Sequence, residues 1–577
     1  MKIFSRTNLI LAFILLLAAT FRLQNINWDN GHQLHPDERA IVMTVEKLKF
    51  PDTLAEFLSP ESSWNPHFFA YGSFPMYLLR VTGNAVSILD PALGQYMSIN
   101  LVGRVLSALA DLLSVILIYK IARKLFNSQI GLLSAFFYTI SVLPIQLSHF
   151  FAVDTFLTSF MLATLYFLIL FYEKPRVKWA ILVGLFFGLS LSTKISAVVL
   201  AAPIGLTLTI DFLLIFLKNP HKYKHWLPHL PKYIKHLSKH ALIICATSFT
   251  TFILLEPYAV IDFTNFWAQT TQQSALTIDP FYFPYTLQYV GKTLYLYEFK
   301  NVFLWGLGSI LGALSVAGAF YFIFLFVKKE RDALFAKEAI VLMFFIPYIL
   351  VVGKFAVGFM RYMLPVYPFF AFFAAVLAYK FIQLLNRRVK NKFILYILYL
   401  VIYTSLLVWP LSFIHIYTEA NTRVSASNWI YSNIPADKTL AVEHWDDQLP
   451  IGGQFSYNTQ ILKLYDSDTP EKWAEIDAQL ALTDYIVIAS NRLYDPLQEL
   501  IDCQSLPVFR CYPQTAEYYR KLFSGEMGFG KVAEFTNYPT IPIFDIPIND
   551  QEADESFTVY DHPKVIIFQK TAQRSTM

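Results

Sequence analysis

A short segment near the start of the chain carries side chains that could perform acid–base chemistry. Residues 34–41, LHPDERAI, bring together one histidine, two carboxylates and one arginine: His35, Asp37, Glu38 and Arg39. A carboxylate can accept the proton of a hydroxyl nucleophile in a transition state. However, the segment follows the first long apolar run of the chain, and charges just outside such a run are equally typical of a solvated loop. The surrounding elements must decide between these alternatives.

The composition indicates a polytopic α-helical membrane protein. Of the 577 residues, 55% are hydrophobic and only 15% are charged, and the mean hydropathy is +0.44. A soluble protein carries roughly 25% charged residues. The net charge of +4 says little by itself, because the placement of Lys and Arg matters more in a membrane protein. We expect no nucleic-acid partner, and the length leaves room for a second domain in water.

Eleven apolar segments approach the length of about 20 residues that a membrane span needs. They cover residues 5–23, 98–119, 129–148, 153–172, 179–194, 196–217, 241–257, 302–327, 338–353, 362–383 and 393–414. The first segment follows two basic residues, as in a signal peptide, but it lacks a small-x-small cleavage site. We therefore expect it to remain as the first of about eleven transmembrane helices.

The loops predict the orientation of these helices. With the N-terminus in the cytoplasm, all five connections on that side are rich in Lys or Arg, as the positive-inside rule requires. One of them, 218–240, has six lysines and five histidines. Its three prolines interrupt the helical register that paired histidines would need, which favours contact with anionic lipid over metal binding. An odd number of helices places the C-terminal part outside.

Two domains are therefore expected. Residues 1–415 form a transmembrane domain with two long outer loops, 25–97 and 258–301, whose aromatic residues indicate segments at the membrane interface. Residues 416–577 are more polar and predict a soluble, extracytoplasmic α/β domain. Its strand-like and helical stretches are DYIVIAS (484–490), KVIIFQ (564–569) and ASNWIYSNI (426–434).

The charged residues near the apolar segments all map to the outer side. They are Asp37 and Glu38, Asp154 (with His149 just before it), Lys194, Glu256 and Asp262, and Lys354 and Arg361. A charge at a helix centre costs roughly 2.5–3.5 kcal/mol on insertion scales, so such residues usually face a cavity or one another. Their common side predicts one polar cavity near the outer leaflet.

Several stretches carry a resemblance to a known family. They are HPDE (35–38), NPHFFAYGSFPMYL (65–78), GRVLSALADLL (103–113), QLSHFFAVDTFLTSF (146–160), STKISA (192–197) and RYMLPVYPF (361–369). In this order the chain resembles the GT-C superfamily of membrane glycosyltransferases. The nearest branch includes protein O-mannosyltransferases and the lipid A aminoarabinose transferase. NTRVSASNWI (421–430) and EHWDDQLP (443–450) resemble a bacterial subset with an outer C-terminal domain. The three carboxylates beside Trp445 in EHWDD are compatible with a sugar or cation site and equally with a solvated turn.

The resemblance implies transfer of a sugar from a polyprenyl-phosphate donor to a hydroxyl of a glycan, lipid or protein acceptor, with inversion at the anomeric carbon. Asp37 is then the expected general base, with Glu38 beside it. Arg361, whose planar fork suits phosphate, and then Lys194 are the expected phosphate ligands. Asp154, Glu256, His67 and Tyr71 complete the expected substrate-binding set.

Each assignment has a structural alternative. Glu38 would then only shape the site, Asp154 would cap a helix, and Arg361 would anchor a helix at the interface. No cofactor is certain, but a divalent cation remains an alternative, with His35, Asp37, His149 and Asp154 as its ligands. Arg104 and Asp111, seven residues apart, are expected to form a structural polar pair. Cys503 and Cys511 lie where disulfides persist, and a bridge is one of two alternatives.

Two other functions compete with a glycosyltransferase in the cell membrane. A secondary transporter would place its charged site near the bilayer midplane and would show internal repeats, and neither feature is evident in this sequence. A non-catalytic membrane protein with an outer sensing or assembly domain is the third alternative. The one-sided distribution of charged residues favours the enzyme.

Overall fold

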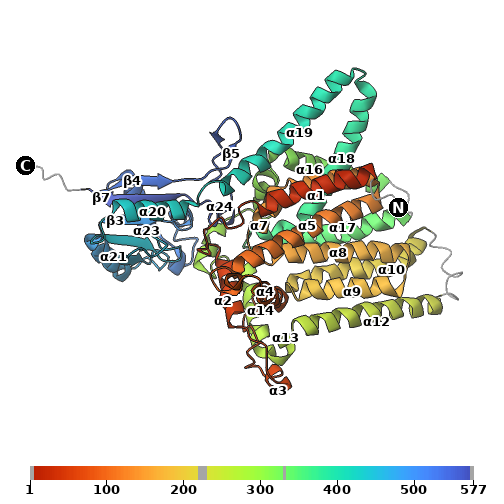
Figure 1. Cartoon of the computed structure of the whole chain (residues 1–577), viewed down its shortest axis with the longest axis horizontal. Coiled ribbons are helices and arrows are strands. Elements are labelled where there is room, and N and C mark those ends of the chain that lie inside the picture. The colour runs from red at the N-terminus through yellow and green to blue at the C-terminus, as the bar shows by residue number, and fades with distance from the viewer. Residues whose placement is uncertain (1–4, 219–229, 329–332, 572–577) are drawn as a thin grey trace, which may run out of the picture.

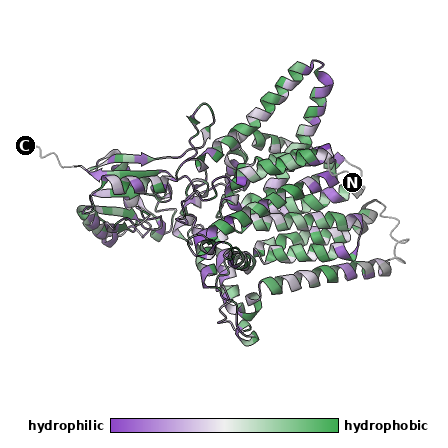
Figure 2. Cartoon of the chain, in the orientation of Figure 1, coloured by the Kyte–Doolittle hydropathy of each residue, from purple (hydrophilic) through white to green (hydrophobic). Residues whose placement is uncertain are grey.

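The structure is a computed structural model that describes residues 5–218, 230–328 and 333–571. Long helices lie side by side in a bundle, and a small sheet domain lies beyond one end of it (Figure 1). The apolar residues follow the helices of the bundle, whereas polar residues increase at its ends and in the sheet domain (Figure 2). The lipid-contact prediction for 218–240 falls partly on 219–229, which lie outside the described residues.

All eleven predicted segments contain helix. The helices are α1 (Arg6–Leu23), α5 (Ile99–Leu125), α6 (Ser128–Thr139), α7 (Val142–Ser148), α8 (Asp154–Glu173), α9 (Val177–Leu191), α10 (Ala201–Lys218), α12 (Leu230–Leu255), α16 (Ser309–Lys328), α17 (Ala333–Val352), α18 (Tyr367–Arg388) and α19 (Lys392–Ile414). Within the described ranges, eight helices are long and apolar enough to cross a membrane, or nine with the bent pair α6 and α7. Two further apolar helices are shorter. The chain is a multi-pass membrane protein, as predicted.

The predicted helix 129–148 is broken. Helices α6 and α7 meet at an angle of 60°, and Pro144 lies in the first turn of α7. A proline ring clashes with the carbonyl four residues earlier, here that of Ile140, so a straight helix cannot continue through this point. The bend turns α7 toward the sheet domain, where Gln146 donates a hydrogen bond to Asp561 (3.0 Å).

The two predicted outer loops fold into short elements between the bundle and the sheet domain. The first loop forms α2 (Pro36–Lys47), α3 (Leu54–Phe57), α4 (Ser73–Val86) and the 3-10 turn η1 (Pro91–Gly94). The second forms α13 (Tyr258–Ile261), α14 (Phe263–Ile278), the 3-10 turn η5 (Pro284–Tyr289) and α15 (Leu296–Asn301). Figure 1 shows α2, α4 and α14 near that end of the bundle.

Two fully buried arginines connect the first loop and α1 to α5. Arg22 pairs with Asp111 (2.5 Å), and Arg104 pairs with both Asp29 (2.7 Å) and Glu38 (2.5 Å). The expected Arg104–Asp111 pair is therefore wrong, because each of the two has a partner in another element.

The C-terminal part has the predicted α/β fold. Its main sheet has the order β2–β1–β3–β7–β4, with β1 (Thr439–Glu443), β2 (Asn458–Leu462), β3 (Tyr485–Ile488), β4 (Phe529–Phe535) and β7 (Val565–Lys570). Strand β1 is parallel to β2 and β3, and β7 is antiparallel to β3 and β4.

Helices cover both faces of this sheet. Side chains of α21 (Pro470–Leu482) and α23 (Pro513–Ser524) pack with one face, and those of α20 (Thr422–Asn433) pack with the other. Cys503 and Cys511 form a disulfide with a Cα–Cα distance of 5.4 Å. The remaining elements are α22 (Tyr494–Glu499), α24 (Glu555–Thr558) and the ribbon of β5 (Thr540–Ile541) and β6 (Ile546–Pro547).

Candidate active site

A cavity of about 1030 Å³ lies where the bundle, the two folded outer loops and the sheet domain meet. Its polar lining includes Asp37, Arg39, Tyr71, Lys194, Glu256, Gln273, Ser274, Thr277, Tyr285, Arg361, Tyr362, Arg423, Trp445, Asp446, Asp447, Arg492, Glu555 and Tyr560. Of the predicted site residues, five therefore face one cavity: Asp37, Tyr71, Lys194, Glu256 and Arg361.

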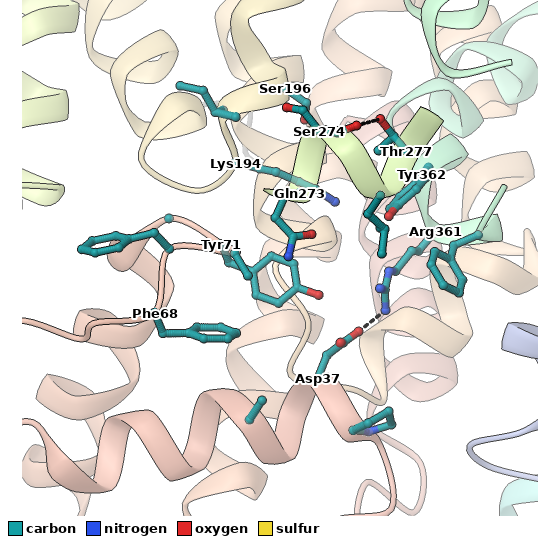
Figure 3. A pocket seen from close by; sticks show the side chains of 18 of the residues that line it. Asp37, Phe68, Tyr71, Lys194, Ser196, Gln273, Ser274, Thr277, Arg361 and Tyr362 are labelled. Atoms are coloured by element: carbon teal, nitrogen blue, oxygen red, sulfur yellow. Dashed lines mark hydrogen bonds and ion pairs between the residues drawn. The ribbon is translucent and has the colours of Figure 1, made fainter. Parts of the chain in front are cut away.

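Asp37 is placed by the start of α2. His35 is the N-cap, its ring nitrogen Nδ1 accepting a hydrogen bond from the Glu38 N–H (3.3 Å), and Pro36 occupies the first helical position. This local geometry is typical of a helix start. The Asp37 side chain takes no part in this cap and points away from the helix. It forms an ion pair with Arg361 (Figure 3). Arg361 lies in the 3-10 turn η7 (Met360–Val366).

The Asp37 carboxylate is accessible and ionised. Its side chain is 24% exposed, and that of Arg361 is 12% exposed. Burial alone would raise the pKa of Asp37, but the Arg361 guanidinium, with help from the Tyr71 hydroxyl, holds that pKa below its usual value. In Figure 3 the Tyr71 hydroxyl points into the space above this ion pair.

Lys194 adds a second cation to the same space. Its ammonium lies 3.1 Å from a carboxylate oxygen of Asp154 and 4.8 Å from the centre of the Tyr362 ring. The Arg361 guanidinium lies 5.9 Å from the same ring. Asp154 is the first residue of α8, whose N-cap is Val153, and its side chain accepts a hydrogen bond from Lys194. Two cations therefore flank one tyrosine at the cavity wall.

Another part of the cavity wall is apolar. It is formed by Val198, Val199, Phe252, Val351, Val352 and Phe355, from the 3-10 turn η2 (Ile195–Leu200), α12, α17 and the turn after α17. Val198 is 59% exposed and Val351 is 53% exposed, although both line the cavity. The cavity therefore opens on one side toward the apolar outer surface of the bundle.

Glu38 has a different environment from Asp37. It is fully buried, it does not line the cavity, and Arg104 donates to both of its carboxylate oxygens (2.9 and 2.5 Å). The Phe151 N–H also donates to it (2.8 Å). These contacts connect α2 to α5 and to the loop before α8, which is the arrangement that the structural alternative for Glu38 expects.

The predicted histidines are each held in separate places. His35 is buried between the rings of Phe150 (4.5 Å) and Tyr560 (4.2 Å), and burial lowers its pKa to about 3, so its ring is neutral. His149 stacks on Tyr417 (3.8 Å), and both of its ring nitrogens contact backbone carbonyls. His67 pairs with Asp262 (3.5 Å) outside the cavity lining.

These positions bear on the proposed cation site. Among the described residues, no group of three or more His, Cys, Asp or Glu side chains has an arrangement that could hold a metal ion. Asp37 and Asp154 instead face Arg361 and Lys194 respectively. The four suggested metal ligands are therefore not brought together.

Several lining residues were not predicted from the sequence. Helix α14 contributes Thr270, Gln273, Ser274 and Thr277, which occupy positions i, i+3, i+4 and i+7 and so lie on one face of the helix. That spacing is a signal that the sequence does contain. Arg492 comes from a loop of the sheet domain, and Trp445 and Asp447 come from the EHWDD stretch, whose site role was one of two alternatives. Nothing local indicates that these loops approach α2.

Part of the chain matches a known protein family. Residues 97–257 match the model of a family described as dolichyl-phosphate-mannose-protein mannosyltransferase. No curated protein matches the chain.

Solved structures with a similar chain path include three from different organisms. One is the oligosaccharyltransferase AglB of Archaeoglobus fulgidus in complex with an inhibitory peptide and a dolichol-phosphate, at 14% identity over 98% of this chain and 88% of that chain, with a TM-score of 0.49. The second is ArnT of Cupriavidus metallidurans bound to undecaprenyl phosphate, at 13% identity over 83% and 92%, with a TM-score of 0.40. The third is the Pmt1–Pmt2 complex of S. cerevisiae bound to the sugar donor, at 18% identity over 49% and 36%, with a TM-score of 0.30.

The family match confirms the resemblance to membrane glycosyltransferases of the GT-C type, and with it the prediction of an enzyme over a transporter or a scaffold. The matched range contains three of the predicted site residues, Asp154, Lys194 and Glu256. The ion pair of Asp37 and Arg361 lies outside that range, so the family match says nothing about it.

Proposed function

We propose that the protein transfers a sugar from a polyprenyl-phosphate donor to an acceptor hydroxyl at the outer surface of the cell membrane. The observation that carries the proposal is the Asp37–Arg361 ion pair, which faces a cavity with a second cation and an apolar side. A base beside cations suits a reaction in which a hydroxyl loses a proton and a phosphate leaves.

The donor would lie with its lipid along the apolar wall and its phosphate between Arg361 and Lys194. Arg361 has five N–H donors, and its buried Nε has no hydrogen-bond partner among the described residues. Arg361 can therefore hold Asp37 and a phosphate oxygen at the same time. The charge that develops on the departing phosphate would meet cations already in place.

The reaction is a single displacement. The acceptor oxygen forms a bond to the anomeric carbon while the bond from that carbon to the phosphate oxygen breaks. The hydroxyl proton passes to Asp37, and the polyprenyl phosphate keeps the electron pair. Attack opposite the leaving group inverts the anomeric centre. As negative charge grows beside Arg361, its hold on Asp37 weakens and the carboxylate becomes a stronger base.

The direct experiment measures transfer of radiolabelled sugar from synthetic polyprenyl-phosphate sugars to membrane acceptor fractions by the purified full-length protein. Asp37→Asn should lower the transfer rate at least about 100-fold, the range expected for loss of a general base. Glu46→Gln, an exposed carboxylate on the same helix, is the matched control and should stay within about twofold of wild type. Equal rates for wild type and Asp37→Asn would contradict the assignment of the base.

The orientation has its own test. Ser524 at the end of α23 and Lys390 between α18 and α19 are both exposed. The proposal expects a membrane-impermeant maleimide to label Ser524→Cys in intact cells and to label Lys390→Cys only after lysis. The reverse pattern would place the sheet domain in the cytoplasm and end the proposal of an outer active site.

A further inference from the structure

We infer that the acceptor is a carbohydrate, and that its sugar ring binds against Trp445 in a subsite which the sheet domain adds to the cavity. This inference rests on the proposed function and specifies its acceptor. The subsite consists of Trp445 and the charged residues around it: Arg39, Asp447, Arg492 and Glu555. It lies at the part of the cavity wall that loops of the sheet domain provide.

Trp445 has the exposure and the conformation of a binding residue. Its side chain is 41% exposed although it lines the cavity. Its backbone φ is +75°, a strained value for a large side chain. Such strain persists only where the surroundings impose it, and it concentrates at functional sites. Here Arg492 donates to the Trp445 carbonyl (3.3 Å) and is itself held by Glu555 (2.6 Å).

The polar groups around the ring suit adjacent hydroxyls. Asp447 accepts from Arg39 (3.1 Å) and lies 3.2 Å from a guanidinium nitrogen of Arg423. Arg39 is 38% exposed and Asp447 16%, so both retain hydrogen-bonding capacity toward the cavity. Vicinal sugar hydroxyls can donate to a carboxylate and accept from a guanidinium. The C–H face of a sugar carries partial positive charge and stacks on the negative face of an indole.

The subsite is close to the proposed base. Tyr285 lies 6.2 Å from Trp445 between ring centroids, and it lines the same cavity as Asp37. Arg39 is two residues after Asp37 on α2. A ring stacked on Trp445 would therefore lie beside the side chains that lead to the Asp37 carboxylate.

A peptide acceptor is less compatible with this wall. Extended peptides commonly bind by pairing with an exposed sheet edge. The edge strands here are β2 and β4, and among the described residues neither strand lines the cavity. The sheet domain lines the cavity with residues of its helices and loops.

The test measures sugar binding apart from catalysis, in full-length protein in nanodiscs. Mannotriose, maltotriose and chitotriose serve as probes in saturation-transfer difference NMR. We expect at least one to bind wild type, and Trp445→Ala to weaken that binding about tenfold or more, since 1.4 kcal/mol of lost stacking is a factor of ten. Trp445→Phe should retain most of it. Trp267→Ala, which removes an exposed tryptophan outside the cavity, should bind as wild type does.

Further arms separate the possible failures. Trp445→Gly removes the ring and also relieves the positive φ, so an unchanged melting temperature with lost binding excludes misfolding. Asp37→Asn should abolish transfer but keep sugar binding. Trp445-dependent binding without any sugar transfer would support the subsite and refute the proposed function. Three results would overturn the inference. The acceptor KM could stay unchanged in Trp445→Ala, or no sugar probe could show binding that depends on Trp445. The third is binding of a Ser/Thr peptide that is weakened by Trp445→Ala as much as sugar binding is.

Discussion

Asp37 and Arg361 are 324 residues apart in the chain, yet their side chains form an ion pair that faces the central cavity. The first comes from a helix formed by an outer loop and the second from a 3-10 turn before α18. Because each charge stabilises the other, the proposed function expects a change at either residue to alter both the affinity for phosphate and the reactivity of the carboxylate.

Asp37→Asn should therefore bind phosphate more tightly while it loses activity. The substitution removes a negative charge beside the Arg361 guanidinium, so a bound phosphate no longer competes with a carboxylate. We expect the Kd for polyprenyl phosphate to fall severalfold, as measured by microscale thermophoresis in detergent. Glu46→Gln should leave this Kd unchanged, and a weaker affinity in Asp37→Asn would contradict phosphate binding at Arg361.

Arg361→Lys keeps the charge and removes the planar fork. A lysine makes a point contact and cannot bind a carboxylate and a phosphate through parallel N–H groups. The donor KM should rise by about tenfold or more, measured as initial transfer rates across donor concentration. Lys354→Gln alters an exposed cation seven residues earlier and should leave the donor KM unaltered. Equal changes in both variants would indicate a general surface-charge effect.

Arg104→Met should destabilise the protein strongly. It would leave Asp29 and Glu38 buried without their shared cation, and breaking a buried ion pair typically costs about 3–5 kcal/mol. The same substitution at Arg520, whose pairs with Glu517 and Glu526 are about half exposed, should change the melting temperature far less, because ion pairs in water contribute little to stability. Thermal unfolding followed by tryptophan fluorescence measures both. Similar melting temperatures for the two variants would contradict the structural role given to the Arg104 cluster.

Stability should fall as the pH rises above neutrality, because of His562. Burial alone would lower its pKa, but the carboxylates of Asp561 and Asp550 raise it to about 10, and both lie within 2.9 Å of its ring. The folded state holds this proton more tightly than the unfolded state, whose pKa is about 6.5. The stabilisation is complete below pH 6.5 and is lost progressively up to about pH 10.

The corresponding measurement is the melting temperature of wild type and His562→Gln between pH 6 and pH 10. Wild type should lose more than about 3 °C over this range, and the variant should start lower and change less. Parallel curves for the two proteins would show that another group is responsible.

The sequence predicted those features that depend on local patterns. The length of the apolar segments predicted the helices of the bundle. In the C-terminal part, short apolar runs between polar stretches predicted strands such as β3 and β7. The break at Pro144 was missed because apolar length alone does not show where a helix bends. The partners of Glu38 and Arg104 were missed for a different reason. They lie 66 residues apart in the chain, and only the folded path of the first outer loop brings them together.

The candidate site was accessible to the sequence only in part. The predicted membrane topology placed Asp37, Lys194 and Arg361 on the same side of the membrane. Because charged residues avoid lipid, this indicated that they share one polar surface. The carboxylates beside Trp445 indicated a sugar or cation site, with a solvated turn as the alternative, but no local pattern placed Trp445 or Arg492 at this cavity. The docking of the sheet domain depends on contacts such as Tyr417 with Asp561 (2.8 Å). Such contacts leave no periodic pattern.

The cavity lining has two parts of opposite character, an apolar part at Val198 and Val351 and a polar part at the loops of the sheet domain. Under the proposed function, a lipid-linked donor would reach the cavity from the bilayer and a water-soluble acceptor from the aqueous side. An inhibitor designed for the polar part would then need no lipid tail, because it would stop the reaction without displacing the donor.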